Sequence, residues 1–287
     1  MRRLSLLALL VAALLLPGVA SAGGVAFCAR VFPPSTTSIE CREPAVSDLA
    51  PLRALPRLEA LLLVNNAVTD LSPLASLTRL EWLTVTGNPV ADLGPLAELE
   101  RLEYLNVGAT DVRDLSPLAG LSALETLYAY GTKVAELGPL AGLGRLRTLG
   151  LAGTPVADLS PVAGLGALEV LDVSGTAVVD LGPVAGLRAL TLLNLTQTAV
   201  VDLGPVAALK KLERLYCSNS QVVELAPLAY LPSLIYLGLL GTPVRDAGAL
   251  AKLTRLETLY LPIGVPIAQV EELRRALPRT TIRVSPK

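Results

Sequence analysis

Leucines recur along most of the chain in a spacing that repeats every 22 residues. When the first leucine of each copy is called position 1, position 4 is leucine in all ten copies, and positions 11 and 20 are valine and leucine in nine. The first positions are Leu58, Leu80, Leu102, Leu124, Leu146, Leu168, Leu190, Leu212, Leu234 and Leu256. A period of this length predicts a solenoid, in which each unit buries its leucines only against its neighbours.

Each copy predicts one short strand followed by one turn. Positions 1, 4 and 6 are apolar, so we expect them to point inward around a parallel strand, while positions 3, 5 and 7 project from the other face. Position 13 carries an acidic residue, and in most copies a proline follows three residues later. We expect the carboxylate to accept a backbone N–H and the proline to fix φ, so that only short 3₁₀ segments fit before the next strand.

The spacing Leu80-x-x-Leu83-x-Val85-x-x-Asn88-x-Val90 resembles the leucine-rich repeat consensus. The 22-residue length with its Asp-Leu-x-Pro-Leu motif is similar to the bacterial internalin type, over about residues 36–264. The resemblance implies an α/β fold, namely a right-handed solenoid with a parallel β-sheet on the concave face and short 3₁₀ or irregular segments on the convex face. It also implies protein recognition.

One position departs from that family. Position 9 is asparagine in the first two copies and threonine or serine in the next seven. A hydroxyl has one donor where an amide has two, so we expect a thinner ladder of hydrogen bonds, or one completed by water.

The chain divides into four predicted segments. Two arginines, an apolar run and the small residues Ala20-Ser21-Ala22 predict a cleavable secretory signal peptide over residues 1–22. We expect an N-terminal cap with a degenerate first repeat over 23–57, the repeat array over 58–265, and a C-terminal cap over 266–287 with a helix at 270–277 and a strand at 281–284. No later stretch is apolar for 18 residues without a charge, so we expect a secreted or periplasmic protein that does not insert into a membrane.

Composition narrows the possible functions. The chain of 287 residues contains no histidine and carries a net charge of −1, so it lacks the commonest general base, the commonest zinc ligand and any basic field for nucleic acid. The acidic row at position 13 offers one carboxylate per repeat, short of the roughly six to eight oxygens that calcium requires. We expect no enzymatic activity, no cofactor, no metal and no nucleic-acid partner.

The three cysteines differ in their predicted surroundings. Cys28 and Cys41 both fall in the N-terminal cap, and an exported chain meets oxidising conditions, so we expect a disulfide between them. Cys217 occupies inward position 6 of its repeat and is expected to be a small buried apolar side chain. Without a histidine to activate it, a catalytic role is not expected.

Aromatic residues gather at the positions that project from the sheet. Seven of the eight tryptophan and tyrosine residues lie at positions 3, 5 or 7: Trp82, Tyr104, Tyr128, Tyr130, Tyr216, Tyr236 and Tyr260. Such side chains are enriched at interface hot spots, so we expect the concave face to bind a protein, although tyrosine also suits an exposed sheet without any function. The isolated charges Asp172 and Arg214 lie on the same face and complete the candidate binding residues.

The leading hypothesis is therefore an exported, non-enzymatic solenoid that recognises a protein partner on its concave face. An inhibitor or regulatory subunit of an enzyme, and a structural component of the cell envelope, remain alternatives. A row of glutamates at position 2 has basic residues two positions before several members. We expect this row to be a self-neutralised, solvated edge.

Overall fold

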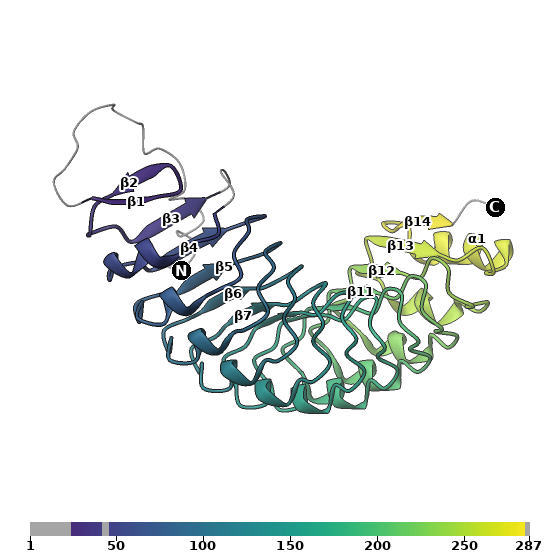
Figure 1. Cartoon of the computed structure of the whole chain (residues 1–287). Helices are drawn as coiled ribbons and strands as arrows, with labels where there is room; N and C mark the ends of the chain where they lie inside the picture. Colours follow the sequence, from purple (N-terminus) through teal and green to yellow (C-terminus); the bar gives the residue numbers. More distant parts are fainter. Residues whose placement is uncertain (1–23, 42–45, 285–287) are drawn as a thin grey trace.

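The computed structural model describes residues 24–41 and 46–284, so the predicted signal peptide lies outside the described residues. A parallel sheet of twelve strands runs through this part of the chain in strict sequence order from β3 to β14. The strands line the inner side of a curved solenoid, and short helical turns line its outer side (Figure 1). The predicted solenoid is confirmed.

The strands of the sheet are three or four residues long. They are β3 Ser38–Cys41, β4 Ala60–Leu63, β5 Trp82–Thr84, β6 Tyr104–Asn106, β7 Thr126–Tyr128, β8 Thr148–Gly150, β9 Val170–Asp172, β10 Leu192–Asn194, β11 Arg214–Tyr216, β12 Tyr236–Gly238, β13 Thr258–Leu261 and β14 Thr281–Val284. Neighbouring strands pair without slippage, so that Trp82 lies opposite Tyr104 and Leu83 opposite Leu105. Each repeat position therefore forms a continuous row along the solenoid.

The core is built from the inward rows. In the second repeat, Leu80, Leu83 and Val85 are completely buried, as predicted for positions 1, 4 and 6. Complete burial of one such side chain stabilises the folded state by about 1.5–3 kcal/mol. Most of that burial is against adjacent repeats, which explains why the leucine pattern continues without interruption.

Short 3₁₀ helices form the outer side of the solenoid. They are η2 Ala50–Ala54, η3 Ser72–Leu74, η4 Gly94–Leu96, η5 Ser116–Leu118, η6 Gly138–Leu140, η7 Ser160–Val162, η8 Gly182–Gly186, η9 Gly204–Ala208, η10 Ala226–Tyr230 and η11 Gly248–Lys252. Asp70 shows how they begin: its Oδ1 accepts the backbone N–H of Ser72 at 2.8 Å, and Pro73 follows in the helix. Hydrogen bonds from the side chain and backbone of Ser72 lower the pKa of Asp70. The predicted capping role is confirmed for the aspartates of this row.

Position 8 turns the chain away from the sheet. In nine consecutive repeats this residue has a φ between 52° and 70°: Asn65, Gly87, Ala109, Gly131, Gly153, Gly175, Gln197, Asn219 and Gly241. Glycine adopts this left-handed conformation without steric cost and asparagine tolerates it, which explains five glycines and two asparagines in the row.

Position 9 holds neighbouring repeats together less firmly along most of the array. Asn88 Oδ1 accepts the backbone N–H of Val68 at 3.0 Å, and its Nδ2 donates to the carbonyl of Leu63 at 2.7 Å. Thr110, one repeat further on, donates only to the carbonyl of Val107 in its own repeat, at 2.6 Å. The change from amide to hydroxyl therefore thins the ladder between repeats, as expected.

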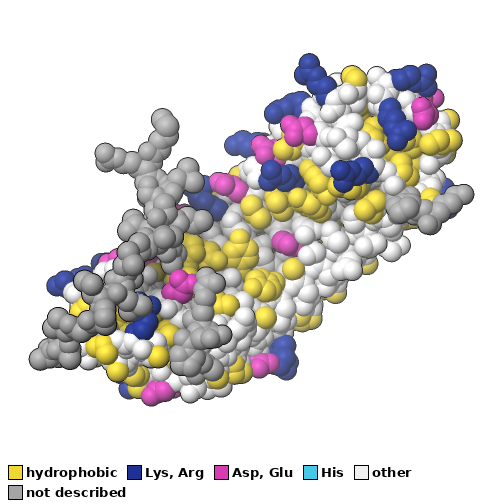
Figure 2. All heavy atoms as spheres, turned by 90° about the horizontal axis from the view of Figure 1, so that it is seen from above, with side chains coloured by type: hydrophobic (Ala, Val, Ile, Leu, Met, Phe, Trp, Pro, Cys, Tyr) yellow, Lys and Arg dark blue, Asp and Glu magenta, His cyan; other side chains and the backbone are white. Residues whose placement is uncertain are grey.

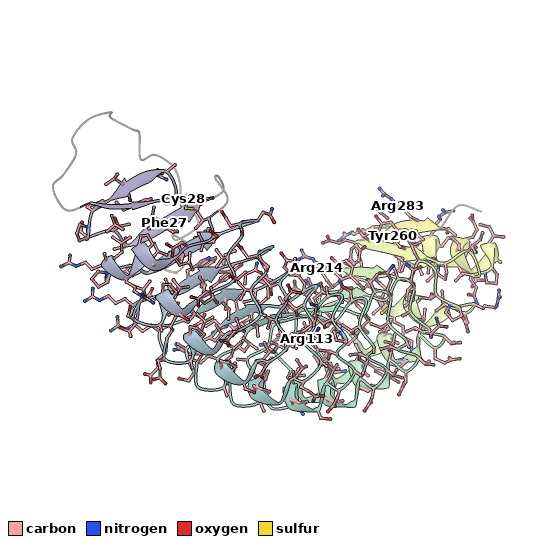
Figure 3. All side chains as sticks on the ribbon, in the orientation of Figure 1. Phe27, Cys28, Arg113, Arg214, Tyr260 and Arg283 are labelled. Atoms are coloured by element: carbon pink, nitrogen blue, oxygen red, sulfur yellow. A yellow bond between two sulfur atoms is a disulfide. The ribbon has the colours of Figure 1, made fainter. Side chains whose placement is uncertain are left out.

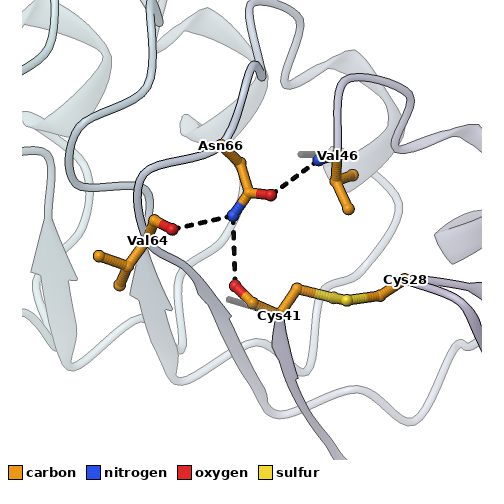
Figure 4. The surroundings of a disulfide bond; sticks show 5 residues. All are labelled: Cys28, Cys41, Val46, Val64 and Asn66. Carbon is orange, nitrogen blue, oxygen red and sulfur yellow. Dashed lines mark hydrogen bonds between the residues drawn. A yellow bond between two sulfur atoms is a disulfide. The ribbon is translucent and has the colours of Figure 1, made fainter. Parts of the chain in front are cut away.

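The N-terminal end is closed by a disulfide-linked cap. The hairpin of β1 Val25–Phe27 and β2 Arg30–Phe32 precedes β3, and Cys28 is bonded to Cys41 as predicted. Asn66 lies beside this bond and joins the cap to the array, because its Oδ1 accepts the N–H of Val46 and its Nδ2 donates to the carbonyl of Cys41 (Figure 4).

The C-terminal end is closed by a helix and the last strand. Helix α1, Ile267–Ala276, begins three residues before the predicted start because Pro266 already directs the chain into it. Val270 and Leu273 are buried against the array, and β14 pairs with β13 at the expected residues. Cys217 is completely buried, as predicted, and this burial raises the pKa of its thiol.

Candidate binding surface on the concave face

The aromatic side chains are separated from the core and form two groups on the concave face. All seven are half-buried, whereas Tyr230 lies on the outer side in η10 and is 64% exposed. Seen from above, apolar side chains gather in patches along the hollow of the molecule (Figure 2). We call the group Trp82, Tyr104, Tyr128 and Tyr130 the N-terminal platform, and the group Tyr216, Tyr236 and Tyr260 the C-terminal platform.

The N-terminal platform is built around a face-to-face stack. The ring centroids of Trp82 and Tyr104 are 3.6 Å apart and their planes differ by 5°. Tyr104 also meets Tyr128, at a centroid distance of 6.0 Å and an angle of 58°. These contacts hold the rings in fixed positions before any partner arrives, which lowers the entropic cost of using them for binding.

Two glycines make room for the remaining rings of this platform. A Cβ atom on Gly108 would lie 2.3 Å from Cζ of Tyr130, and one on Gly150 would lie 2.6 Å from Cδ1 of Tyr128. Both tyrosine rings therefore lie directly over the backbone of a neighbouring repeat, Tyr128 over β8 and Tyr130 over the turn that follows β6. The sequence pattern did not reveal this pairing, because it shows the glycines and tyrosines without showing the direction in which each ring leans.

Acidic side chains border the N-terminal platform. Glu59, Glu81 and Glu103 occupy position 2 of successive repeats. Burial raises the pKa of Glu81, and the charges of Glu103 and Glu59 raise it further, outweighing the attraction of Arg101. At Glu81 the neighbouring glutamates thus act more strongly than the nearest basic residue, Arg101.

Ion pairs do neutralise this row in the middle of the array. Arg147 itself stands at position 2, where it contacts Glu169 and lies 3.8 Å from Glu125. Arg145, two positions earlier in the chain, is also 3.8 Å from Glu125. Arg147 thus pairs with the acidic residues of both adjacent repeats.

The C-terminal platform has tilted rings and arginines. The centroids of Tyr216 and Tyr236 are 4.5 Å apart, and those of Tyr236 and Tyr260 are 5.9 Å apart. Arg283 on β14 lies over the Tyr260 ring, with 5.7 Å between Cζ and the centroid, and its Nη1 donates to the tyrosine hydroxyl at 3.3 Å. Sequence reasoning missed Arg283 because the residue belongs to the cap, although its pairing with Tyr260 places it on the same face.

The predicted charged residues have different surroundings. Asp172, midway between the platforms, accepts the backbone N–H of Ser174 at 2.9 Å, and Asn106 and Asn194 make the same local bond to Gly108 and Thr196. Its carboxylate is thus partly used to shape the chain after the strand. Arg214 is exposed and points to the concave side, as does Arg283 (Figure 3).

Residues 24–41 and 46–284 lack two other kinds of site. No cluster of three or more His, Cys, Asp or Glu side chains is arranged there to hold a metal ion. Nor does this part contain a helix with the length and apolarity needed to cross a bilayer.

Comparison with known proteins shows which solved structures have the same fold. No protein-family model matches the chain, and no curated protein matches it in sequence. Among solved structures, the internalin InlF of Listeria monocytogenes superposes with a TM-score of 0.80 at 25% identity, over 89% of this chain and 78% of that one. Internalin C2 of the same organism is 31% identical, with a TM-score of 0.62, over 63% of this chain and 82% of its own. The chain belongs to the internalin-like leucine-rich repeat proteins.

The likeness of fold extends beyond the internalins. A plant peptide hormone receptor, solved in complex with RGF2, superposes on the internalin-like protein with a TM-score of 0.63 at 17% identity, over 86% of this chain and 46% of the receptor. At that identity the likeness concerns the fold alone. Leucine-rich repeat solenoids of this kind are scaffolds for binding proteins and peptides, because their sheet presents an extended concave surface.

Proposed function

We propose that this internalin-like protein is exported, has no catalytic activity and binds a protein partner on its concave face. The observation that carries the proposal is the distribution of its aromatic side chains. Seven of eight tryptophan and tyrosine residues lie half-buried on one face in two groups, and six of these rings contact another ring of their group. Rings that are partly exposed and already held in place bury large areas on binding at low entropic cost.

Several features support the non-enzymatic part of the proposal. The chain contains no histidine, and the buried thiol of Cys217 has a raised pKa, so it does not supply a nucleophile. The candidate residues of the concave face are aromatic rings and isolated charges rather than a nucleophile beside a base. Fold similarity to the internalins favours binding as well.

Export is supported by the cap and by the start of the sequence. The disulfide between Cys28 and Cys41 is of the kind that persists in oxidising compartments. Residues 1–22 have the pattern of a secretory signal peptide, which adds an independent reason. We therefore propose a secreted or periplasmic location.

The test replaces one ring of each platform. We expect the Tyr128→Ala, Tyr236→Ala double variant to fold normally, since both rings are half-buried surface groups, and to capture its partner from envelope or host extract at least tenfold less well. Tyr230→Ala, which removes the exposed tyrosine of the outer side, is the matched control and is expected to capture normally. Equal capture by the double variant and the control would contradict the assignment of the concave face.

A further inference from the structure

The charges next to the C-terminal platform are arranged on the sheet itself. Arg214 occupies position 3 of β11, and Arg283 lies in β14 opposite Tyr260. From β11 to β14, no residue at positions 3, 5 or 7 in the described part of the chain is acidic. At positions 3, 5 and 7, this end of the concave face therefore combines tyrosine rings with positive charge only, while Glu213 and Glu257 stand beside it at position 2.

The two arginines bracket the three rings. Arg214 pairs with Tyr236 across the sheet, and Tyr260 pairs with Arg283. Gly238 separates Tyr216 from Tyr260 in the position-5 row, and a Cβ atom there would lie 3.4 Å from Cε1 of Tyr236. The Tyr236 ring thus leans over the glycine and fills the centre of the platform.

The two arginines and the hydroxyl of Tyr236 have hydrogen-bond donors that are available to a partner. The side chain of Arg214 is exposed, and its guanidinium makes no ion pair or hydrogen bond with any residue that the structure describes. Arg283 is held against Tyr260 by one hydrogen bond, which leaves most of its five donors unused. Burial and the neighbouring Tyr216 and Tyr260 raise the pKa of Tyr236, so its hydroxyl stays protonated and can donate.

We propose that the C-terminal platform binds an acidic segment of the partner protein, with a carboxylate on each arginine and the tyrosines covering the apolar part between them. Guanidinium groups bind carboxylates by paired, charge-assisted hydrogen bonds, and stacked rings do not compete for them. The inference deepens the proposed function and rests on it. It specifies that the part of the partner bound at the C-terminal end of the concave face is acidic.

The spacing of the arginines limits the shape of that segment. Three strand-to-strand steps separate β11 from β14, which corresponds to about 14 Å. An extended chain covers that distance in about four residues. We therefore expect two acidic residues roughly four positions apart in a segment that crosses the strands.

The other platform would not accept the same segment. Repeats one to four have no basic residue at positions 3, 5 or 7 that could offset the position-2 glutamates Glu59, Glu81 and Glu103, and like charges across an interface disfavour binding. A partner with an acidic segment at one end of its contact surface would consequently be held in a single orientation along the solenoid.

Selection from a library of random peptides tests the proposal with a defined probe. A phage-displayed library of dodecapeptides is panned against the full-length protein, and the selected peptides are measured by fluorescence anisotropy alongside versions with Glu→Gln and Asp→Asn changes. We compare the protein with an Arg214→Gln, Arg283→Gln variant. Arg113→Gln, Arg188→Gln is the matched control, because both residues are exposed arginines outside the concave positions and the change in net charge is the same.

We expect acidic peptides to be selected and their affinity to fall about tenfold or more in the Arg214, Arg283 variant and on neutralisation of the peptide. The control variant should stay within about twofold. Selection of neutral or basic sequences, absence of any binder, or equal affinity of the two variants would overturn the proposal. Heparin binding that depends on the same arginines, with no acidic peptide selected, would assign the platform to anionic polysaccharide and also overturn it.

Failure of this inference and failure of the proposed function give different results. If the tyrosine variant loses the partner while the Arg214, Arg283 variant retains it, the concave face binds but not through an acidic segment. If both variants retain the partner, the concave face itself is not the binding surface.

Discussion

The two platforms share one backbone but differ in construction. In the N-terminal platform, Trp82 and Tyr104 lie flat on each other at 3.6 Å, and glutamates border the stack. In the C-terminal platform, the rings are tilted, with centroids at least 4.5 Å apart, and arginines stand among them. The inward positions determine the backbone of each repeat, whereas the outward positions are free to vary. One array of similar repeats can therefore present chemically distinct surfaces at its two ends.

The ends of the solenoid differ as well. Beyond the N-terminal platform, the cap is linked covalently through Cys28 and Cys41, and Asn66 connects it to the array. Beyond the C-terminal platform, the cap is held by packing of α1, with Val270 and Leu273 buried, and by a hydrogen bond from the Ala247 N–H to Gln269. A terminal repeat has a neighbour on one side only, so each cap determines how firmly its platform is held.

Among the changes considered, removal of the disulfide should have the largest effect on stability, and this effect should differ between the two ends. We expect Cys28→Ser, Cys41→Ser to lower the free energy of unfolding by about 2–4 kcal/mol, and to act mainly at the N-terminal end. Trp82 is the single tryptophan of the chain, so its fluorescence during urea unfolding reports on the N-terminal platform. Its transition should move to lower urea in the variant.

The buried thiol of Cys217 provides the control at the other end. It lies in the eighth repeat beside Tyr216, is completely buried, and reacts with a thiol reagent only when that region opens. We expect its labelling rate under native conditions to be nearly unchanged in the disulfide variant. An equal acceleration at Cys217 would show that the array unfolds as one unit and that the two ends are not independent.

Most of the fold follows from the repeat, because a row of leucines has only one way to be buried. The inward positions were predictable in this way, and the motif of the turn predicted the capping role of Asp70 and its equivalents. The disulfide was predictable on other grounds, because Cys28 and Cys41 both fall in the N-terminal cap of a chain with an export signal. The left-handed position 8 carried a visible signal in its glycines, but Ala109 and Gln197 interrupt it.

The arrangement on the concave face was less predictable. Its residues could be named from strand alternation, whereas the direction of each ring depends on its neighbours. Tyr130 leans over Gly108 rather than standing upright, and Arg283 reaches the face from a cap strand. Asp172 looked like a free charge, yet it bonds the chain two residues on. Such contacts depend on side-chain torsions that the 22-residue period does not constrain.

Two glycine substitutions should affect the two platforms differently, with a smaller change in stability than removal of the disulfide. Gly108→Ala would bring a Cβ to 2.3 Å from Tyr130, so we expect the ring to be displaced and the free energy of unfolding to fall by about 1 kcal/mol. Gly238→Ala meets nothing closer than 3.4 Å in the C-terminal platform and should cost less than about 0.5 kcal/mol. Near-ultraviolet circular dichroism should change in the first variant and stay the same in the second. The opposite order would mean that the rings are not seated on the glycines as described.

The smallest expected effect concerns the charge that distinguishes the N-terminal platform. Because the folded-state pKa of Glu81 is raised above 4.5, the folded protein binds this proton more tightly than the unfolded chain. The ionised carboxylate therefore costs stability at neutral pH, and the cost disappears as pH falls through the raised pKa. Glu81→Gln should increase the free energy of unfolding at pH 7 by less than about 1 kcal/mol, with the gain vanishing in mild acid.

Urea unfolding of both proteins across this pH range measures the difference. The capping residues Asp70, Asp114 and Asp158 have lowered pKa values and lose their contribution as pH falls, but they do so equally in both proteins and cancel. Glu257→Gln is the matched control, because the preceding repeat has Ile235 at position 2 and offers no adjacent glutamate in that direction. A gain of the same size and pH dependence in that control would show that the repulsion is general to the molecule. A gain confined to Glu81 would show that the acidic border is a property of the N-terminal platform alone.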